Sequence, residues 1–138
     1  MRRGRYVLTA SAAANLREAR AWSRARWGKE LTSKYFDDLH KGAQFVAENH
    51  GALLGRQDLS GGSSLLVYPV REHYIVYEPL AERFIAVVAA IRQGRDIPAI
   101  LQKWSAPIRR ELIEIRARIE RGEITWPTQP VAKPRRKK

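Results

Sequence analysis

The sequence contains no cysteine and only three histidines among its 138 residues. The lack of cysteine excludes disulfides and thiolate metal sites, so the chain does not need an oxidising compartment. No apolar run is long enough to cross a bilayer, and the N-terminal segment has no apolar core of signal-peptide length. No metal-ligand spacing is visible. These absences predict a soluble, cytoplasmic protein that makes no membrane contact and uses neither a metal nor a cofactor.

Positive charge is abundant. Lysine and arginine number 26 against 14 aspartates and glutamates, for a formal net charge of +12. This excess favours an acidic partner, such as nucleic acid, an acidic protein or an anionic surface. Eleven basic and only four acidic residues lie in 103–138, where the composition shifts. We therefore predict one domain over residues 1–102 and an extension over 103–138 that ends in a flexible basic tail at 133–138.

The chain is organised around two apolar stretches, residues 74–77 and 84–91, which are rich in the β-branched and aromatic residues typical of strands. A polar connection at 78–83 predicts that they form an antiparallel hairpin. The second stretch is apolar at successive positions, which indicates cover on both of its faces. It ends abruptly in a basic turn that carries Arg92 and Arg95.

The remaining patterns predict an α+β fold. We expect strands at 6–8 and 65–68, and helices at 12–27, 29–48 and about 107–121. The first two helices have only Gly28 between them, so they should pack as an antiparallel hairpin. The expected architecture is an N-terminal strand, then this helical hairpin on one face of a small, mostly antiparallel sheet (β-α-α-β-β-β), then a C-terminal helix.

Several strings, in this order along residues 5–102, resemble the ParE/RelE superfamily of bacterial toxins: Leu8-Thr9, Leu16-Arg17-Glu18, Arg26-Trp27-Gly28, Pro69-Val70, His73-Tyr74-Ile75-Val76-Tyr77 and Gly94-Arg95-Asp96-Ile97-Pro98. The last string looks more like the ParE branch than the RelE branch. Two features depart from the family pattern. The strand around Leu66 lacks the arginine common in relatives, and the segment from Trp104 onward extends beyond the usual family end.

The resemblance implies the toxin of a type II toxin–antitoxin system, held inactive in a hetero-oligomer by a ParD-like antitoxin. ParE-like toxins are described as poisons of DNA gyrase, whereas RelE-like toxins cleave mRNA on the ribosome. RelE-like chemistry is usually associated with a tyrosine after the final strand, and here neither tyrosine nor histidine follows it. We therefore expect a gyrase poison rather than an enzyme. The alternatives are a RelE-like, ribosome-dependent endoribonuclease and a binding module that has lost toxicity.

Four arginines fall at the ends of predicted strands: Arg71, Arg83, Arg92 and Arg95. They could converge along one edge of the sheet and bind phosphate or carboxylate through bidentate contacts. We expect this role for Arg92 and Arg95, which an apolar strand delivers to a fixed place, whereas Arg71 and Arg83 are more typical of solvated charges. A nuclease would use Arg92, Arg95 and Arg71 together with His73 as a proton shuttle.

The C-terminal helix carries an apolar stripe that needs burial, formed by Ile108, Leu112 and Ile115. It either folds back on the sheet or, together with Trp104, binds a partner chain. Trp22 and Trp27 raise the same choice between partner anchor and core residue. Core packing is favoured for Trp27, whereas the pattern does not decide for Trp104.

Overall fold

The computed structural model describes residues 4–53 and 65–124. Residues 55–64, which form a polar stretch of the sequence, and the basic tail expected at 133–138 lie outside the described residues. The elements follow one another as β1 (Arg5–Leu8), α1 (Ala10–Trp27), α2 (Lys29–Asn49), β2 (Leu66–Val70), β3 (His73–Ala81), β4 (Phe84–Arg92), α3 (Ile97–Lys103) and α4 (Ser105–Glu120). The predicted α+β class is confirmed.

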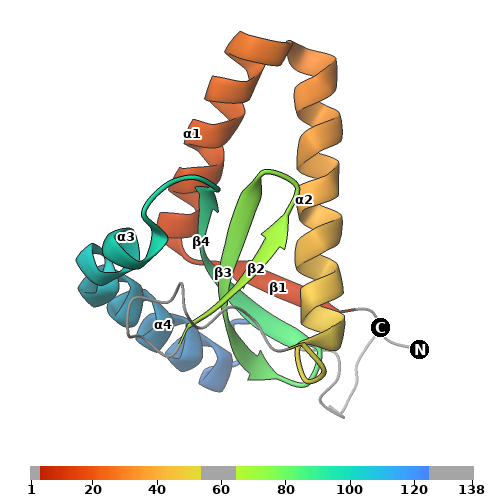
Figure 1. Cartoon of the computed structure of the whole chain (residues 1–138). Helices are drawn as coiled ribbons and strands as arrows, with labels where there is room; N and C mark the ends of the chain where they lie inside the picture. The colour runs from red at the N-terminus through yellow and green to blue at the C-terminus, as the bar shows by residue number, and fades with distance from the viewer. Residues whose placement is uncertain (1–3, 54–64, 125–138) are drawn as a thin grey trace.

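The four strands form one mixed sheet in the order β1-β4-β3-β2 (Figure 1). β2, β3 and β4 are antiparallel neighbours, and β1 joins the sheet parallel to β4. Parallel strands need a crossover connection, and the chain between β1 and β4, which includes the helical hairpin, provides it. β4 is therefore a central strand, with β1 on one side and β3 on the other.

The helical hairpin forms where the sequence predicts it. Thr9 caps α1, because its hydroxyl oxygen accepts a hydrogen bond from the backbone N–H of Ala12. Gly28 separates α1 from α2 and adopts φ 87°, a value that a residue with a Cβ rarely takes. Both helices extend beyond the end of the sheet to reach this connection (Figure 1).

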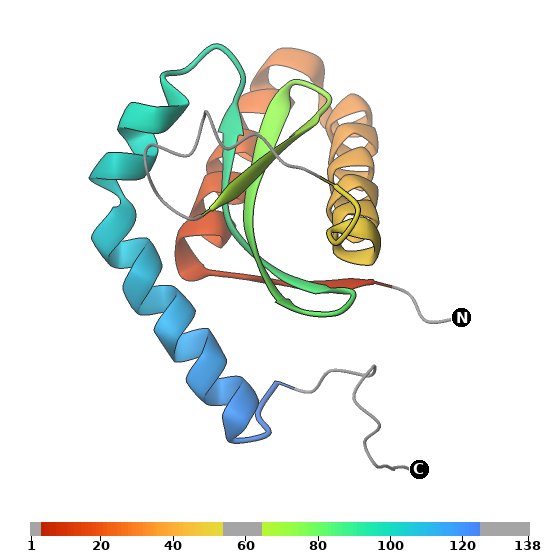
Figure 2. The ribbon, with the colours of Figure 1, turned by 60° about the horizontal axis from the view of Figure 1, so that its bottom comes forward.

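Both faces of β4 are buried, as its unbroken apolar pattern predicts. Eight of its nine residues are buried, and only Arg92 at its end is exposed. The hairpin covers one face, where Val46 and Ala47 meet Tyr77 and Ile85. On the other face, α3 and α4 run along the sheet (Figure 2) and complete a second apolar cluster. The sheet is thus the middle of three layers.

The apolar stripe of α4 folds back on the sheet. Ile108, Leu112 and Ile115 are all buried within the chain. Glu111 adds a polar attachment, because its carboxylate accepts hydrogen bonds from the backbone N–H and the hydroxyl of Ser11, at 3.1 and 2.8 Å. The carboxylate lies at the N-terminal end of α1, where the helix dipole favours negative charge.

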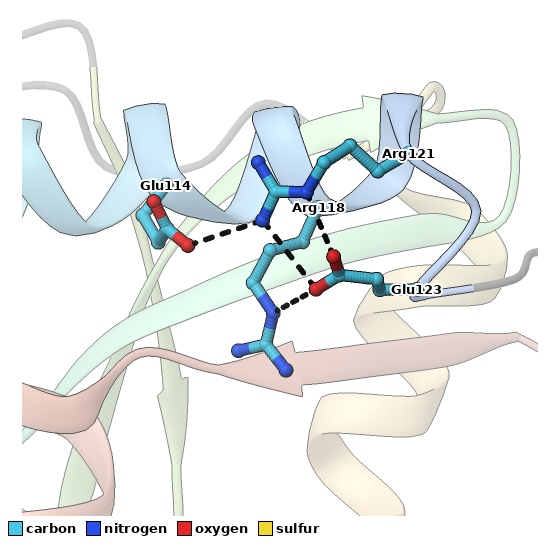
Figure 3. Close-up of polar contacts among 4 residues, drawn as sticks. All are labelled: Glu114, Arg118, Arg121 and Glu123. Atoms are coloured by element: carbon cyan, nitrogen blue, oxygen red, sulfur yellow. Dashed lines mark hydrogen bonds and ion pairs between the residues drawn. The ribbon is translucent and has the colours of Figure 1, made fainter.

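The C-terminal end of α4 carries an exposed ionic cluster of Glu114, Arg118, Arg121 and Glu123 (Figure 3). Arg121 Nε lies 2.7 Å from Glu123 Oε2, and the arginine holds the pKa of Glu123 below its usual range. Solvent and salt screen such a surface cluster, so it orders the residues just after the helix rather than anchoring the helix to the sheet.

Two predicted boundaries are wrong. The segment 78–83 was expected to be a polar connection, but β3 continues through Pro79 to Ala81 and only Glu82 and Arg83 form the turn. The strand tolerates Pro79 because the β3–β4 register shifts between Pro79 and Ala81, and such an irregularity can accommodate a residue without an N–H donor. The second is the start of the C-terminal helical region, which was expected at about residue 107 but begins with α3 at Ile97. Among the described residues, no helix has the length and hydrophobicity that crossing a membrane would require.

Candidate functional site: a cationic cleft at the end of β4

Three of the four strand-end arginines lie at the same end of the sheet. Arg92 is the last residue of β4, Arg95 belongs to the turn that follows, and Arg71 lies in the β2–β3 turn with φ 57°. Arg83 lies at the opposite end, in the β3–β4 turn, where its carbonyl accepts a hydrogen bond from Arg5 N–H. The four arginines therefore do not converge along one edge, since successive turns of an antiparallel meander alternate between the two ends of the sheet.

Gln93 joins the two arginine-bearing turns. Its side-chain amide donates hydrogen bonds to the carbonyls of Arg71 and His73, at 2.9 and 3.1 Å. Its backbone N–H donates to the carbonyl of Glu72 at 2.9 Å. These three bonds fix the backbone on either side of the site. Gln93 is therefore a positioning residue, which no pattern in the sequence singles out.

Trp22 organises the arginine side chains. The guanidinium carbon of Arg92 lies 4.2 Å from the centre of the Trp22 ring, and that of Arg26 lies 4.7 Å from the same centre. Trp27 meets Trp22 edge-on at 5.6 Å and in turn contacts Tyr35. Stacking on an aromatic ring holds a guanidinium in place and leaves its N–H edge available for an anion.

A cleft of about 340 Å³ opens beside this arrangement, between α1, the end of β4 and α3. We call it the β4-end cleft. Its lining includes Trp22, Arg92, Arg95 and Trp104, together with His73 and one carboxylate, that of Glu18. Among the residues that the structure describes, no carboxylate forms an ion pair with Arg26, Arg92 or Arg95. Arg71 differs from these three, because it pairs with Asp38.

His73 is buried at the floor of the cleft, with 3% of its surface exposed. Its Nδ1 lies 2.6 Å from the hydroxyl of Tyr35, and that hydroxyl also accepts the backbone N–H of Glu72 at 3.1 Å. Burial, and then the charge of Arg92, lower the pKa of His73 to about 4, against the opposing effect of Glu72. The ring is therefore neutral at pH 7, and its Nδ1 is hydrogen-bonded to the Tyr35 hydroxyl.

This geometry does not suit the proton shuttle considered for His73. A general base needs a free lone pair near neutral pH. Nδ1 of His73 is already bonded to Tyr35, and a pKa of about 4 makes the ring a weak base. The cleft can bind an anion through arginine, but its histidine is not suited to taking a proton from a substrate.

A second, apolar cleft of about 280 Å³ lies between the helical hairpin and the sheet. We call it the hairpin groove. Leu8, Leu16, Leu39 and Ile75 line it, and Leu8 is 40% exposed. Its polar lining comes from Tyr6, Arg17, Arg20 and His40, and the Tyr6 hydroxyl lies 2.6 Å from His40 Nδ1.

The partner surface expected on the C-terminal extension does not fit this arrangement. Ile108, Leu112 and Ile115 have no more than 8% of their surface exposed, so they offer little to a partner chain. Trp104 is half-buried and lines the β4-end cleft. The exposed apolar residue of α4 is Ile113, at 62%. In the described part of the chain, no group of histidines and carboxylates could hold a metal ion.

Sequence reasoning missed Arg26 and Tyr35 as neighbours of the site. The contact between Trp22 and Arg26 could have been predicted, because the two residues lie one helical turn apart. The contact between Arg92 and Trp22 could not, because it joins residues 70 positions apart in the sequence.

The fold is shared with a protein of a toxin–antitoxin system. The chain superimposes on a solved chain of the chromosomal ParDE TA system from P. aeruginosa with a TM-score of 0.54 and 16% identity, covering 63% of this chain and 92% of that one. The family model described as ParE toxin of type II toxin-antitoxin system, parDE, matches residues 6–98. The chain therefore belongs to the ParE toxin family. No curated protein matches the sequence.

Proposed function

We propose that this ParE-family chain stops growth by binding DNA gyrase and trapping it, without catalysing a reaction itself. The observation that carries the proposal is the β4-end cleft. Its arginines lie at the end of a rigid strand, and no carboxylate among the residues that the structure describes forms an ion pair with them. Binding an anionic surface of a target needs such preorganised cations. The neutral, hydrogen-bonded state of His73 favours binding over proton transfer.

A supercoiling assay tests the proposal. Purified protein, added to gyrase with relaxed plasmid and ATP, is expected to prevent supercoiling and to leave cleaved plasmid after the gyrase is digested. Supercoiling that continues at saturating protein would contradict the proposal. In a parallel translation extract, cleavage of mRNA only in the presence of ribosomes would instead support the endoribonuclease alternative. In cells without the antitoxin, expression of the protein without growth arrest would favour a non-toxic binding module.

The hairpin groove suits the neutralising partner. We propose that a ParD-like antitoxin lays an amphipathic, acidic segment into it. The apolar floor formed by Leu16, Leu39 and Ile75 would bury the apolar side of that segment, and Arg17 and Arg20 at the same groove would meet its carboxylates. This placement would also shield Leu8, an exposed apolar residue of an edge strand.

Replacing Leu8 by aspartate is expected to weaken antitoxin binding on the order of a hundredfold, because it puts a charge against an apolar segment and faces that segment's own carboxylates. Titration calorimetry with the antitoxin encoded beside this chain would measure the change. Ile113→Asp is the matched control, since Ile113 is an exposed apolar residue on a distant helix. Equal affinities for the two variants would place the antitoxin elsewhere.

A further inference from the structure

We infer that the β4-end cleft, extended by Arg26, binds the phosphate backbone of duplex DNA. This inference rests on the proposed function, because gyrase presents its target surface together with bound DNA. The inference specifies the anion that the arginines bind. The binding set is Arg26, Arg92 and Arg95. Trp22 positions the first two of these, and does not itself contact the DNA bases.

The charges of these arginines call for an anionic ligand. Arg26 and Arg92 lie over the same indole ring, and Arg95 lines the cleft with Arg92. All three are exposed, and none forms an ion pair with a carboxylate of residues 4–53 or 65–124. Like charges held this close repel one another, and a polyanion that contacts several of them at once relieves the repulsion.

The aromatic contacts favour backbone recognition over base stacking. Proteins that bind single strands use open aromatic faces on which successive bases stack. The Trp22 ring is already covered by two guanidinium groups, and Trp27 approaches it edge-on. The N–H donors at the guanidinium edges remain available, and such donors bind phosphate oxygens bidentately without distinguishing the base sequence.

An acidic protein segment fits this site less well than DNA does. An amphipathic segment needs an apolar floor, and the hairpin groove provides one. The β4-end cleft has some apolar lining, from Ile91 and Ile100, but the exposed charged groups in and beside it are three guanidiniums and one carboxylate, that of Glu18. Duplex DNA carries one negative charge per about 1.7 Å of its axis, so it supplies several phosphates to such a cluster at once.

Glu18 provides an internal test. It contributes the one carboxylate of the β4-end cleft, and a phosphate bound beside it would be repelled. Removing this charge by Glu18→Gln should therefore tighten DNA binding, whereas a site elsewhere on the protein would respond much less. Glu120→Gln, on the exposed far part of α4, is the matched control.

Fluorescence anisotropy of the full chain with a labelled 20-base-pair duplex, in a salt series and without gyrase, tests the inference. We expect Arg26→Gln and Arg92→Gln each to weaken binding on the order of tenfold at 0.1 M salt, and each to reduce the slope of log K against log salt by about 1. Arg109→Gln and Arg110→Gln remove the same charge from the exposed face of α4 and should change neither quantity appreciably. All variants retain the basic C-terminal residues, so the contribution of these residues cancels.

Equal losses in the cleft variants and the α4 variants would overturn the inference, as would a Glu18→Gln variant no tighter than Glu120→Gln. A polyglutamate peptide provides the other arm. If Arg26→Gln and Arg92→Gln weaken binding of that peptide while duplex binding stays unchanged, the cleft is a site for acidic protein. Because this assay contains no gyrase, its failure leaves the supercoiling result standing, and a failed supercoiling assay leaves this one interpretable.

Discussion

Replacing Arg92 and Arg95 together by glutamine is expected to abolish growth arrest while the protein remains folded. Both side chains are exposed and neither belongs to an apolar cluster, so their loss should leave the core intact. Each charged hydrogen bond to a target is worth about 1.5–3 kcal/mol, so losing two should weaken target binding by about two orders of magnitude or more. Colony counts after induction, in cells without the antitoxin, would measure the effect.

The matched control for this prediction is Arg109→Gln with Arg110→Gln, which makes the same change in net charge on α4. That variant should still arrest growth. Arg92→Lys separates charge from geometry, because lysine keeps the charge but cannot offer the planar fork of a guanidinium stacked on Trp22. We expect it to retain part of the activity. Full arrest by the glutamine double variant, with its thermal melting unchanged, would show that the β4-end cleft is not the toxic surface.

The sequence alone indicated much of the scaffold because local rules and tertiary packing agree there. The continuous apolar run of β4 predicted cover on both faces, and the structure provides it with helices on each side. Gly28 marked the end of α1, and Thr9 caps its start, through chemistry that needs only neighbouring residues. Arg92 and Arg95 stood out for the same reason, since a buried strand must deliver the residues at its end to a fixed place.

The rest depended on contacts between distant parts of the chain. The separation of Arg83 from Arg71 follows from the alternation of successive turns between the two ends of the meander, and not from any local pattern. The fate of Ile108 could not be decided, because an apolar stripe looks the same whether it meets its own sheet or another chain. The contact between Arg92 and Trp22 is invisible to any local pattern.

Helix α1 has two different flanks, and each serves one of the proposed interactions. Arg17 and Arg20 line the hairpin groove, whereas Glu18 and Trp22 line the β4-end cleft. Residues one position apart on a helix point about 100° apart, so a single helix can supply both surfaces. An antitoxin segment in the groove would therefore contact the same helix that supports the cationic cleft.

The stability of the fold is expected to fall by about 3 kcal/mol between pH 7 and pH 4 because of His73 alone. Burial, and then the charge of Arg92, lower the pKa of His73 to about 4, from 6.5 in the unfolded chain. Above pH 6.5 the imidazole is neutral in both states and the full stability is present. As the pH falls from 6.5 toward 4, the unfolded state binds a proton that the folded state does not, and stability is lost. Urea unfolding at successive pH values would measure this loss.

The variant His73→Gln isolates this effect, because other titrating groups contribute equally to both proteins. Its stability should be lower at pH 7, since the hydrogen bond with Tyr35 is disturbed, but it should fall less steeply between pH 6.5 and 4. Parallel curves for the two proteins would contradict the prediction.

Arg92→Gln links the core to the cleft. Removing the charge of Arg92 should raise the pKa of His73, although burial should keep that pKa below 6.5. An NMR titration of the imidazole would measure the change. A pKa that does not respond to Arg92→Gln would mean that Arg92 does not stand over the cleft floor, and the geometry proposed for the toxic surface would fail with it.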